Sequence, residues 1–406
     1  MSIMSLENAL HAALELRWLY IDFNSYFASV EQQLSPHLRG KPIAVVPVET
    51  DATCAIAASY DAKAYGVKTG TPIYEAKKIC PGLICVLAQH EKYVEFHHRI
   101  QEEVEQHIHI DVVASIDEVA SRLMNNENNV KRVSEIASSI KAGLANNIGE
   151  YVRCSIGVAP NKYLAKVATD LHKPDGFTIL EANDIPGKLL SLKLCDLPGI
   201  GWNMEKRLMK AGVTSVEQLY SYEAHQLRKI WGSVWGEKMW YYLRGVEVPD
   251  EETERRSIGH SHVMAPELRE PTQAKYVARR LTMKAASRLR RLDYFASSFQ
   301  LSVRLEEGAR LEASARCYRA QDSMTFLHML DRLWARLMKE SRGKRIKKAS
   351  VTLGELVPAG QLEPELFEVL PDIDLRARER IAVLLDDDVQ VLRRQLVAAA
   401  WHGDGE

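Results

Sequence analysis

The stretch Leu-Arg-Trp-Leu-Tyr-Ile-Asp at residues 16–22 decides the fold, together with Val-Val-Ala-Ser-Ile-Asp-Glu-Val-Ala at residues 112–120. Both are apolar runs of the kind that form buried strands, and they carry the carboxylates Asp22, Asp117 and Glu118. Moving an unpaired anion out of water costs several kcal/mol unless a positive charge neutralises it. An acid at a strand end is most often a turn residue or a helix cap. The alternative is a site for divalent metal ions, and the rest of the chain has to distinguish the two.

Alternating helices and strands surround these two stretches as far as residue 180. Apolar residues at helical spacing in 130–148, together with the neighbouring strand patterns, indicate an α/β layer whose strands carry the acids. The elements expected in this layer are helices at 5–15, 25–35, 130–148 and 161–171, and strands at 17–23, 42–47, 53–58 and 153–158.

Only short helices are expected from about residue 185 to residue 250. Within this segment, Leu197-Pro-Gly-Ile-Gly201 precedes a helical run at Trp202–Ala211. A Pro-Gly-x-Gly hairpin between helices exposes backbone N–H groups at a helix N-terminus, where a phosphate oxygen can bind. A simple tight turn is the alternative. The helical spacing of Trp231, Trp235 and Trp240 predicts that these rings form the core of this small domain.

A polar run without apolar residues, Pro249-Asp-Glu-Glu-Thr-Glu254, is typical of a linker and precedes the last domain. Residues 255–350 hold 22 Lys and Arg against 9 Asp and Glu, whereas residues 351–406 hold 5 against 12. A basic block of domain size is expected for a protein that binds a phosphate backbone, with a solvated charged face as the alternative. The expected order is β-α-β-β-α-β, an open sheet backed by two helices. Its strands are expected at 256–263, 297–305, 311–318 and 347–356, and its helices at 271–291 and 323–341, with one further helix in the acidic tail at about 375–399.

Composition limits the class of protein. The 406 residues are too many for one ordinary core and suggest roughly three to four domains. Charged residues make up 26% and hydrophobic residues 46%, as in soluble globular proteins. No apolar stretch approaches the roughly 20 residues that cross a bilayer, and the first residues lack a secretory signal, so a cytoplasmic protein without membrane contact is expected. The six cysteines have neither zinc-site nor disulfide spacing.

Seven motifs in order strongly resemble the Y-family (translesion) DNA polymerases, over about residues 16 to 356. The family's pattern is matched by Asp22-Phe-Asn-Ser-Tyr-Phe-Ala-Ser-Val-Glu31, the stretch 59–72, Ser115-Ile-Asp-Glu118, the stretch 154–166, Lys173-Pro-Asp-Gly176, Leu197-Pro-Gly-Ile-Gly201 and Arg256-Ser-Ile-Gly-His260.

The resemblance implies an α+β multidomain fold, a right-hand polymerase with palm, fingers, helical helix-hairpin-helix thumb and β-α-β-β-α-β little finger. The implied domains are a palm at 1–30 and 86–184, fingers at 31–85, a thumb at 185–248, a linker at 249–255, a basic DNA-binding little finger at 256–357 and an acidic tail at 358–406.

The family's chemistry accounts for the acids in the strands. Phosphoryl transfer from a deoxynucleoside triphosphate to a primer 3′-hydroxyl uses two Mg²⁺ ions about 4 Å apart, with Mn²⁺ as an alternative. By resemblance, Asp22 and Asp117 bridge the ions, Glu118 holds the ion on the primer side, and the backbone carbonyl of Phe23 reaches the ion on the triphosphate. Without metal, we expect the carboxylates to repel one another and to raise one another's pKa.

The resemblance also assigns contacts to nucleotide and DNA. Tyr60, Lys63 and Lys173 match positions that hold the incoming triphosphate, and Phe27 matches the steric gate that excludes a ribose 2′-hydroxyl, with a core aromatic as the alternative. Pro198, Gly199, Ile200 and Gly201 match the DNA-binding hairpin of the thumb. The implied partners are primer-template DNA and deoxynucleoside triphosphates, and the protein is expected to be a monomer.

Several positions depart from the commonest family pattern. Asn24 replaces a frequent Asp, and Lys63 stands where many members have Arg; both resemble the branch of the catalytic subunit of the bacterial SOS-induced mutagenic polymerase. The ammonium group of lysine acts as a point charge, whereas the guanidinium group of arginine can donate two hydrogen bonds to one phosphate. The stretch Val119–Met124 also departs, without loss of a metal ligand. In the tail, Gln361-Leu-Glu-Pro-Glu-Leu-Phe367 is similar to a sliding-clamp peptide but is longer between the Gln and the Leu-Phe.

Two other functions are weighed against a DNA polymerase. A non-catalytic paralogue acting as an adaptor between DNA and clamp predicts loss of the acids, and all three are present. A nucleotidyl cyclase built on a similar palm explains neither the hairpin Pro198–Gly201 nor the basic block at 255–350.

Overall fold

The computed structural model describes residues 15–249 and 254–361. The helices expected at 5–15 and 375–399, and all of the clamp-like peptide after Gln361, lie outside these residues. The chain divides into two compact units, Met1–Asp250 and Glu251–Glu406.

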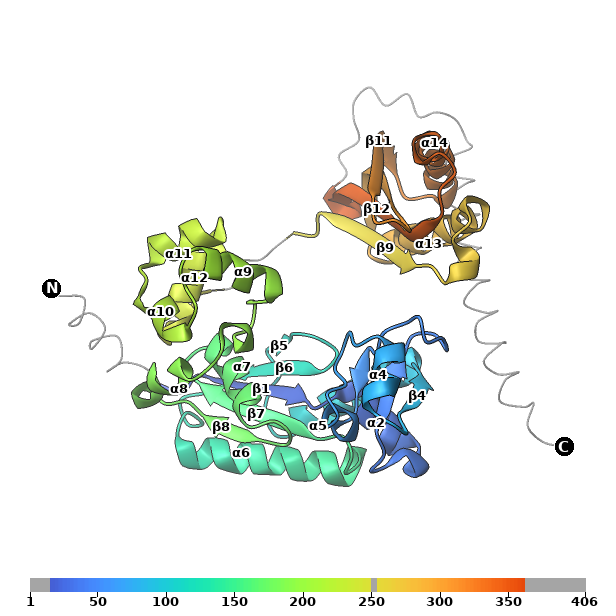
Figure 1. Cartoon of the computed structure of the whole chain (residues 1–406). Helices are drawn as coiled ribbons and strands as arrows, with labels where there is room; N and C mark the ends of the chain where they lie inside the picture. Colours follow the sequence, from blue (N-terminus) through green and yellow to red (C-terminus); the bar gives the residue numbers. More distant parts are fainter. Residues whose placement is uncertain (1–14, 250–253, 362–406) are drawn as a thin grey trace. The chain divides into compact units, whose positions relative to one another are not determined.

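A five-stranded sheet of order β5-β6-β1-β7-β8 forms the centre of the first unit (Figure 1). Its middle strand β1 runs antiparallel to both β6 and β7, and β8 is parallel to β7. Its strands are β1 (Trp18–Phe23), β5 (Val112–Val113), β6 (Glu118–Arg122), β7 (Cys154–Ala159) and β8 (Phe177–Ile179).

Alternate side chains of β1 enter two different cores. Leu19 and Ile21 pack into one core with helices α5 and α6, whereas Trp18 and Tyr20 pack into another with α7 and the helical bundle that follows. Because successive strand residues point to opposite faces, one strand joins both cores. The helices of this part are α2 (Tyr26–Leu34), α5 (His90–Glu105), α6 (Val130–Gly143), continued by the π-helical turn η2 (Leu144–Ile148), and α7 (Lys162–Leu171).

The stretch 112–120 forms a hairpin and not the single strand that its sequence suggests. Strands β5 and β6 pair with each other, and the acids come at the turn and the start of β6. The Ser115 hydroxyl accepts the Asp117 N–H at 3.2 Å and donates to the Asp117 carboxylate at 2.5 Å. This local bonding favours a turn over a continuous strand.

A smaller three-stranded sheet, β3-β2-β4, lies between α2 and α5 in the sequence. The strand expected at 53–58 is reduced to two residues, because Cys54 forms an isolated bridge with Pro72 instead. The elements here are η1 (Pro36–Leu38), β2 (Ile43–Val46), β3 (Ala57–Ala58), α3 (Tyr60–Lys63), α4 (Ile73–Ile79) and β4 (Ile84–Leu87).

Short helices follow the five-stranded sheet, as the sequence predicts. Trp231 is buried among them, but Trp235 is 57% exposed, so the prediction that all three tryptophans form core is wrong for Trp235. The elements are η3 (Ala182–Asp184), α8 (Gly187–Leu190), η4 (Leu194–Asp196), α9 (Trp202–Lys210), α10 (Val216–Ser221), α11 (Ala224–Trp231) and α12 (Val234–Leu243).

The second unit has the expected β-α-β-β-α-β order. Its antiparallel sheet, β11-β10-β12-β9, packs one face against α13 and α14 around Phe299 and Phe326. The elements are β9 (Ser257–Val263), η5 (Pro266–Leu268), α13 (Pro271–Arg291), β10 (Tyr294–Leu305), β11 (Arg310–Ala320), α14 (Ser323–Ser341), β12 (Ile346–Pro358) and η6 (Ala359–Gln361). The expected α+β fold with this terminal domain is confirmed.

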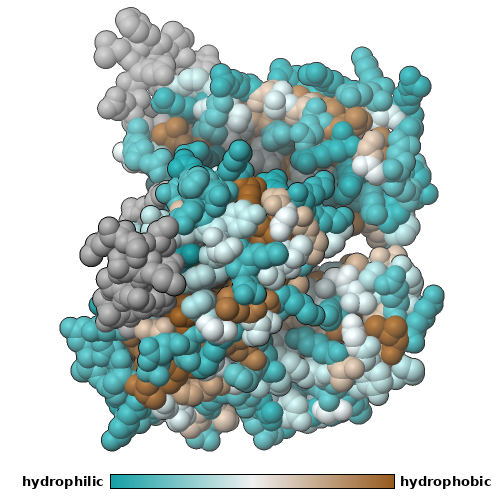
Figure 2. Space-filling model, turned by 60° about the vertical axis from the view of Figure 1, so that its left-hand side comes forward, coloured by the Kyte–Doolittle hydropathy of each residue, from teal (hydrophilic) through white to brown (hydrophobic). Residues whose placement is uncertain are grey.

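Hydrophilic side chains dominate the surface seen in Figure 2, and hydrophobic residues lie there in scattered patches. Among the described helices, none is long and apolar enough to cross a membrane. All six cysteines are described, and each is a free thiol.

Candidate active site

The three predicted acids gather at one end of β1. Asp22 is paired across the strands with Glu118, the first residue of β6, and Asp117 directly precedes it. The Phe23 N–H donates to the carbonyl of Asp117 at 2.9 Å, which fixes the turn beside the strand end. Asp22 is 7% exposed, while Asp117 and Glu118 are half-buried. The strand pairing therefore places all three carboxylates on adjacent chain segments.

Two lysines from α7 and the loop after it face these acids. The Lys166 ammonium contacts Asp22 Oδ2 and lies 2.6 Å from Glu118 Oε1. The Lys173 ammonium lies 2.6 Å from Asp22 Oδ1 and 2.7 Å from Asp170 Oδ1. Asp22, Glu118 and Asp170 thus form one connected network with these two lysines.

The expectation that the acids raise one another's pKa is wrong for Asp22. Burial by itself raises the pKa of its carboxyl, but the positive charges of Lys166 and Lys173 outweigh burial and hold that pKa below its ordinary value. Burial likewise works against the charged form of Lys166, yet Asp22 and Asp170 raise the pKa of its ammonium group. Both partners are charged at neutral pH.

The donor set suits a hard divalent cation. Among the described residues, no three Asp, Glu, His or Cys side chains form a group that could enclose a metal ion. The Lys166 ammonium contacts both Asp22 and Glu118, and the Asp117 carboxylate is bonded to Ser115. Three carboxylates on neighbouring segments are nevertheless the oxygen ligands that Mg²⁺ prefers, so the donors fit a magnesium site by their chemistry, whereas Lys166 and Lys173 occupy the Asp22 carboxylate in this structure.

Tyr60 and Lys63 lie at opposite ends of α3, a one-turn helix capped by the Ser59 hydroxyl. The Lys63 ammonium stands over the Tyr60 ring, 4.4 Å from its centroid. Burial and the neighbouring Lys173 charge lower the pKa of Lys63, and burial with the Asp22 charge raises the pKa of Tyr60 to about 12. These shifts place Tyr60, Lys63 and Lys173 in the electrostatic neighbourhood of Asp22.

Phe27 projects from the first turn of α2 and is partly buried. Its ring stacks on Tyr93 at a centroid distance of 4.4 Å. The Tyr93 hydroxyl donates to the buried carboxylate of Glu31 at 2.6 Å, and this hydrogen bond fixes the position of the Tyr93 ring.

Comparison with known families gives three matches in chain order. Residues 21–170 match the impB/mucB/samB family, residues 195–247 match the DNA polymerase-iota thumb domain, and residues 255–366 match the impB/mucB/samB family C-terminal domain. The DNA polymerase IV of Moorella thermoacetica is 31% identical over 360 residues, which cover 86% of this chain and 88% of that protein. The DNA polymerase IV of Pelotomaculum thermopropionicum is 37% identical over 248 residues, 60% of this chain and 61% of that protein.

The chain belongs to the Y-family DNA polymerases.

Solved Y-family structures share its fold. The Y-family DNA polymerase chimera Dbh-Dpo4(243-245)-Dbh superposes with a TM-score of 0.73 at 24% identity and covers 84% of this chain and 99% of that one. The insertion ternary complex of Dbh DNA polymerase gives a TM-score of 0.56 at 24% identity, with the same coverage.

The predicted hairpin of this Y-family chain opens onto a cavity of about 360 Å³. Gly199 has a φ of +87°, which favours glycine, and Gly201 caps the N-terminus of α9. Both glycines line the cavity, with Trp202 and Arg207 among its other residues. Ile200 is buried in the core, and its N–H donates to the Leu197 carbonyl at 3.0 Å, so it holds the hairpin together.

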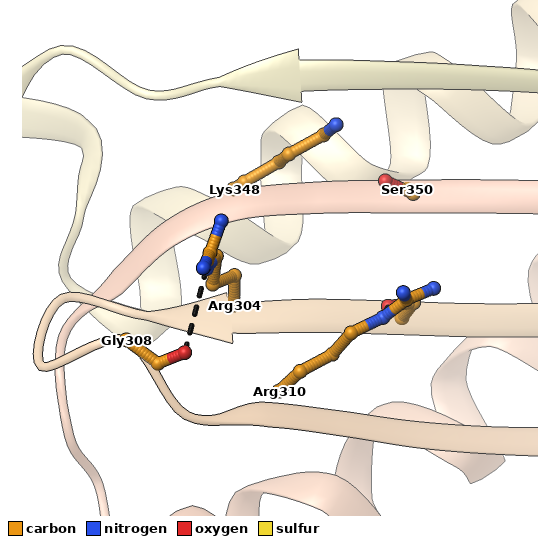
Figure 3. Close-up of a pocket in the computed structure, with 6 residues that line it drawn as sticks. Arg304, Gly308, Arg310, Lys348 and Ser350 are labelled. Carbon is orange, nitrogen blue, oxygen red and sulfur yellow. Dashed lines mark hydrogen bonds between the residues drawn. The ribbon is translucent and has the colours of Figure 1, made fainter. Parts of the chain in front are cut away.

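A second cavity, of about 270 Å³, lies on the basic unit (Figure 3). Arg304, Arg310 and Lys348 extend from the neighbouring strands β10, β11 and β12 around it. Arg304 on the middle strand is paired with Arg310 on one side and with Lys348 on the other. Ser302 is likewise paired with Ser350. These residues alternate with Leu301, Val303 and Leu305, which pack into the core with α13 and α14. The basic residues therefore occupy the face of the sheet opposite those helices.

Sequence reasoning missed Lys166 and Asp170 as site residues. The available signal was the i, i+4 spacing of Lys166 and Asp170 on the helix expected at 161–171, with Lys173 two residues beyond the end of that helix. Trp235 was missed as well; with Trp18, Tyr20 and Lys166 it lines a cavity of about 310 Å³ beside the acids.

Proposed function

We propose that this chain is a template-directed translesion DNA polymerase, which adds deoxynucleotides to a primer 3′-hydroxyl during DNA damage bypass. The observation that carries the proposal is the meeting of Asp22, Asp117 and Glu118 at the end of β1, beside the cations Lys63 and Lys173. Family membership supports the reaction class, and the acid and cation arrangement supports the site.

Asp22, Asp117, Glu118 and the carbonyl of Phe23 are the residues proposed to hold Mg²⁺. When bound there, the metal supplies charge stabilisation for phosphoryl transfer and activates the primer hydroxyl. Lys63, Lys173 and the Tyr60 hydroxyl would bind the triphosphate and offset its negative charge. The Phe27 ring, supported by Tyr93, would lie against the sugar and exclude a 2′-hydroxyl.

The DNA is proposed to bind through two separate features. The N–H groups at the start of α9 suit a phosphate of the backbone. The sheet face that carries Arg304, Arg310 and Lys348 provides a second, positively charged surface, with the small residues Ser302 and Ser350 beside the cations. We propose the domain division expected from sequence, with fingers at 31–85 and little finger at 256–357.

Primer extension by the purified chain tests the proposal. The native protein should extend a primer only in the presence of Mg²⁺ or Mn²⁺, and Asp117→Ala should lose about 10³-fold or more in rate, since the reaction depends on its carboxylate. Asp111→Ala is a matched control, because Asp111 is an exposed acid in the same hairpin whose carboxylate accepts the Arg122 N–H. Binding of primer-template without nucleotide incorporation by the native chain would favour the adaptor instead.

A further inference from the structure

The loop between α7 and β8 carries Lys173 to the acids. It runs from His172 to Gly176, and Asp175 within it has a φ of +56°. Non-glycine residues occupy this left-handed region only when surrounding contacts hold them there, although Asp tolerates it better than most. What holds this loop therefore decides where the Lys173 ammonium lies.

Two buried side chains hold the loop from inside. Asn24 Oδ1 accepts the Asp175 N–H at 2.7 Å, and the Ser155 hydroxyl accepts the Gly176 N–H at 3.2 Å. Asn24 Nδ2 donates to the Ser155 hydroxyl at 3.0 Å, so the two side chains form one unit. Asn24 is 2% exposed and Ser155 is fully buried.

Hydrogen bonds of the Asn24 backbone fix the position of its side chain. The backbone N–H of Asn24 donates to the Arg153 carbonyl at 2.8 Å, and the backbone carbonyl of Asn24 accepts the Ser29 hydroxyl at 2.6 Å. Asn24 also lies two residues after Asp22. A single strand end therefore places the carboxylate and holds the loop that brings Lys173 within 2.6 Å of that carboxylate.

We propose that Asn24, acting through Ser155 and the 172–176 loop, is a positioning residue for the triphosphate-binding lysine Lys173. This inference rests on the proposed function, which gives Lys173 its role toward the triphosphate. Asn24 touches neither nucleotide nor primer in this scheme. It determines how well the ammonium group is preorganised, and therefore how tightly the triphosphate binds.

Steady-state kinetics of four variants test the proposal. Asn24→Leu and Ser155→Ala should each raise KM for the deoxynucleoside triphosphate about tenfold and change kcat less than threefold. Inorganic tripolyphosphate, used as a competitive inhibitor, should lose affinity by the same factor, because Lys173 would contact phosphate and not base. Asn24→Asp keeps an acceptor for the Asp175 N–H and should stay within about threefold of the parent.

Ser121→Ala is the matched control. It deletes another fully buried hydroxyl of the same sheet, on β6, for which the described residues provide no hydrogen-bond partner, so KM should stay within twofold of the parent. Melting curves followed by circular dichroism establish that each variant is folded. Should Asn24→Leu fail to fold, Ser155→Ala and Asn24→Asp still decide the question.

A double-mutant cycle with Lys173→Ala is the decisive measurement. If Asn24 acts through Lys173, adding Asn24→Leu or Ser155→Ala to Lys173→Ala should raise KM no further. The inference would be overturned if the factors by which the single substitutions raise KM multiplied in the double variant. An unchanged KM in folded Ser155→Ala would also overturn it. Either result would leave the polymerase proposal intact. Absence of Mg²⁺-dependent extension by the parent chain would instead reject the proposed function.

Discussion

At the scale of single residues, the ring of Phe27 packs against the apolar core of the first unit and stacks on one ring of that core, Tyr93. Its partner Tyr93 is fixed by hydrogen bonding to Glu31. A ring supported in this way can act as a rigid wall, whereas a loosely packed ring would yield to an extra hydroxyl group.

Phe27→Ala should let ribonucleotides into the site. Removal of the ring leaves space for a 2′-hydroxyl, so the ratio of kcat/KM for deoxynucleotides over ribonucleotides should fall by roughly 10²-fold. The ratio is measured by single-nucleotide insertion with each triphosphate. Tyr93→Phe keeps the stacked ring but deletes its hydrogen bond to Glu31, so it should lower the ratio by less than Phe27→Ala does. Equal discrimination by Phe27→Ala and the parent would show that Phe27 is only a core residue.

Single residues also explain what the sequence could and could not predict about the site. Asp22, Asp117 and Glu118 were recognisable because acids in apolar strands are unusual. The depressed pKa of Asp22 was not predictable, because the lysines that cause it are more than 140 residues away in the chain and reach it only through the packing of α7 on the sheet. The bond from Asn24 to Asp175 was hidden for the same reason.

At the scale of elements, α7 packs unusually close to β7. A Cβ atom on Gly157 would lie 2.1 Å from the Ala165 carbonyl oxygen and 2.6 Å from the Thr169 nitrogen, both of them backbone atoms of the helix. The helix that carries Lys166 can approach the sheet only because this strand position has no side chain.

Gly157→Ala should therefore push α7 away from the sheet. We expect a loss of about 1–3 kcal/mol in the free energy of unfolding, measured by urea titration, and a drop in polymerase activity as Lys166 and Lys173 shift. Gly187→Ala is the control, because a Cβ there meets nothing within 4 Å. A Gly157→Ala protein as stable and as active as the parent would contradict the close approach.

Helix α5 is tied to the turn after α6 by a buried acid. Glu103 is 4% exposed and accepts hydrogen bonds from His107 Nε2 at 3.0 Å and from Asn147 Nδ2 at 2.8 Å. Burial raises the pKa of Glu103, but these two hydrogen bonds outweigh it and leave the pKa below its ordinary value.

Acid should remove the contribution of Glu103 to stability. With its pKa depressed in the folded state, the unfolded chain binds the proton more readily, so the contribution is complete above the unfolded pKa of about 4.3 and is lost as pH falls through the lower folded value. Glu103→Gln should lower the melting temperature by a few degrees at pH 7, and the difference should shrink below about pH 4. Glu105→Gln, at the exposed end of α5, should leave the curve of melting temperature against pH unchanged. If the difference in melting temperature between Glu103→Gln and the parent stayed constant with pH, ionisation of Glu103 would not contribute to stability.

Most of the helices and strands could be predicted because their apolar residues recur at the spacing of the face that each element buries. The strands of the second unit and the helices α13 and α14 were expected within a few residues of their observed bounds. The failures at 53–58 and 112–120 have one cause, since short apolar runs do not reveal whether a local turn or bridge interrupts the strand.

At the scale of the whole molecule, charge is distributed unevenly. The net formal charge is −1, yet the excess of 13 positive charges in residues 255–350 includes the three cations that line one sheet face. Binding to DNA through such a face should be dominated by release of counterions from the phosphates.

Affinity for primer-template should fall steeply with salt. Replacing Arg304, Arg310 and Lys348 by Gln should reduce the slope of log K against log salt by about one for each phosphate that is no longer neutralised. The comparison triple is Arg332, Arg336 and Lys339, which lie on α14, the helix that packs on the other face of the sheet. Fluorescence anisotropy across a salt series measures both slopes. An equal effect of the two triples would show that general charge, and not this face, binds the DNA.

The network of Asp22 with Lys166 and Lys173 has a consequence for how the protein is made. These lysines belong to the same unit as the acids, so charge balance at the end of β1 is supplied from within the chain. A newly synthesised chain therefore holds the acids, both lysines and all five strands of the central sheet once β8 (Phe177–Ile179) has been synthesised. We expect this sheet to form without waiting for a divalent ion.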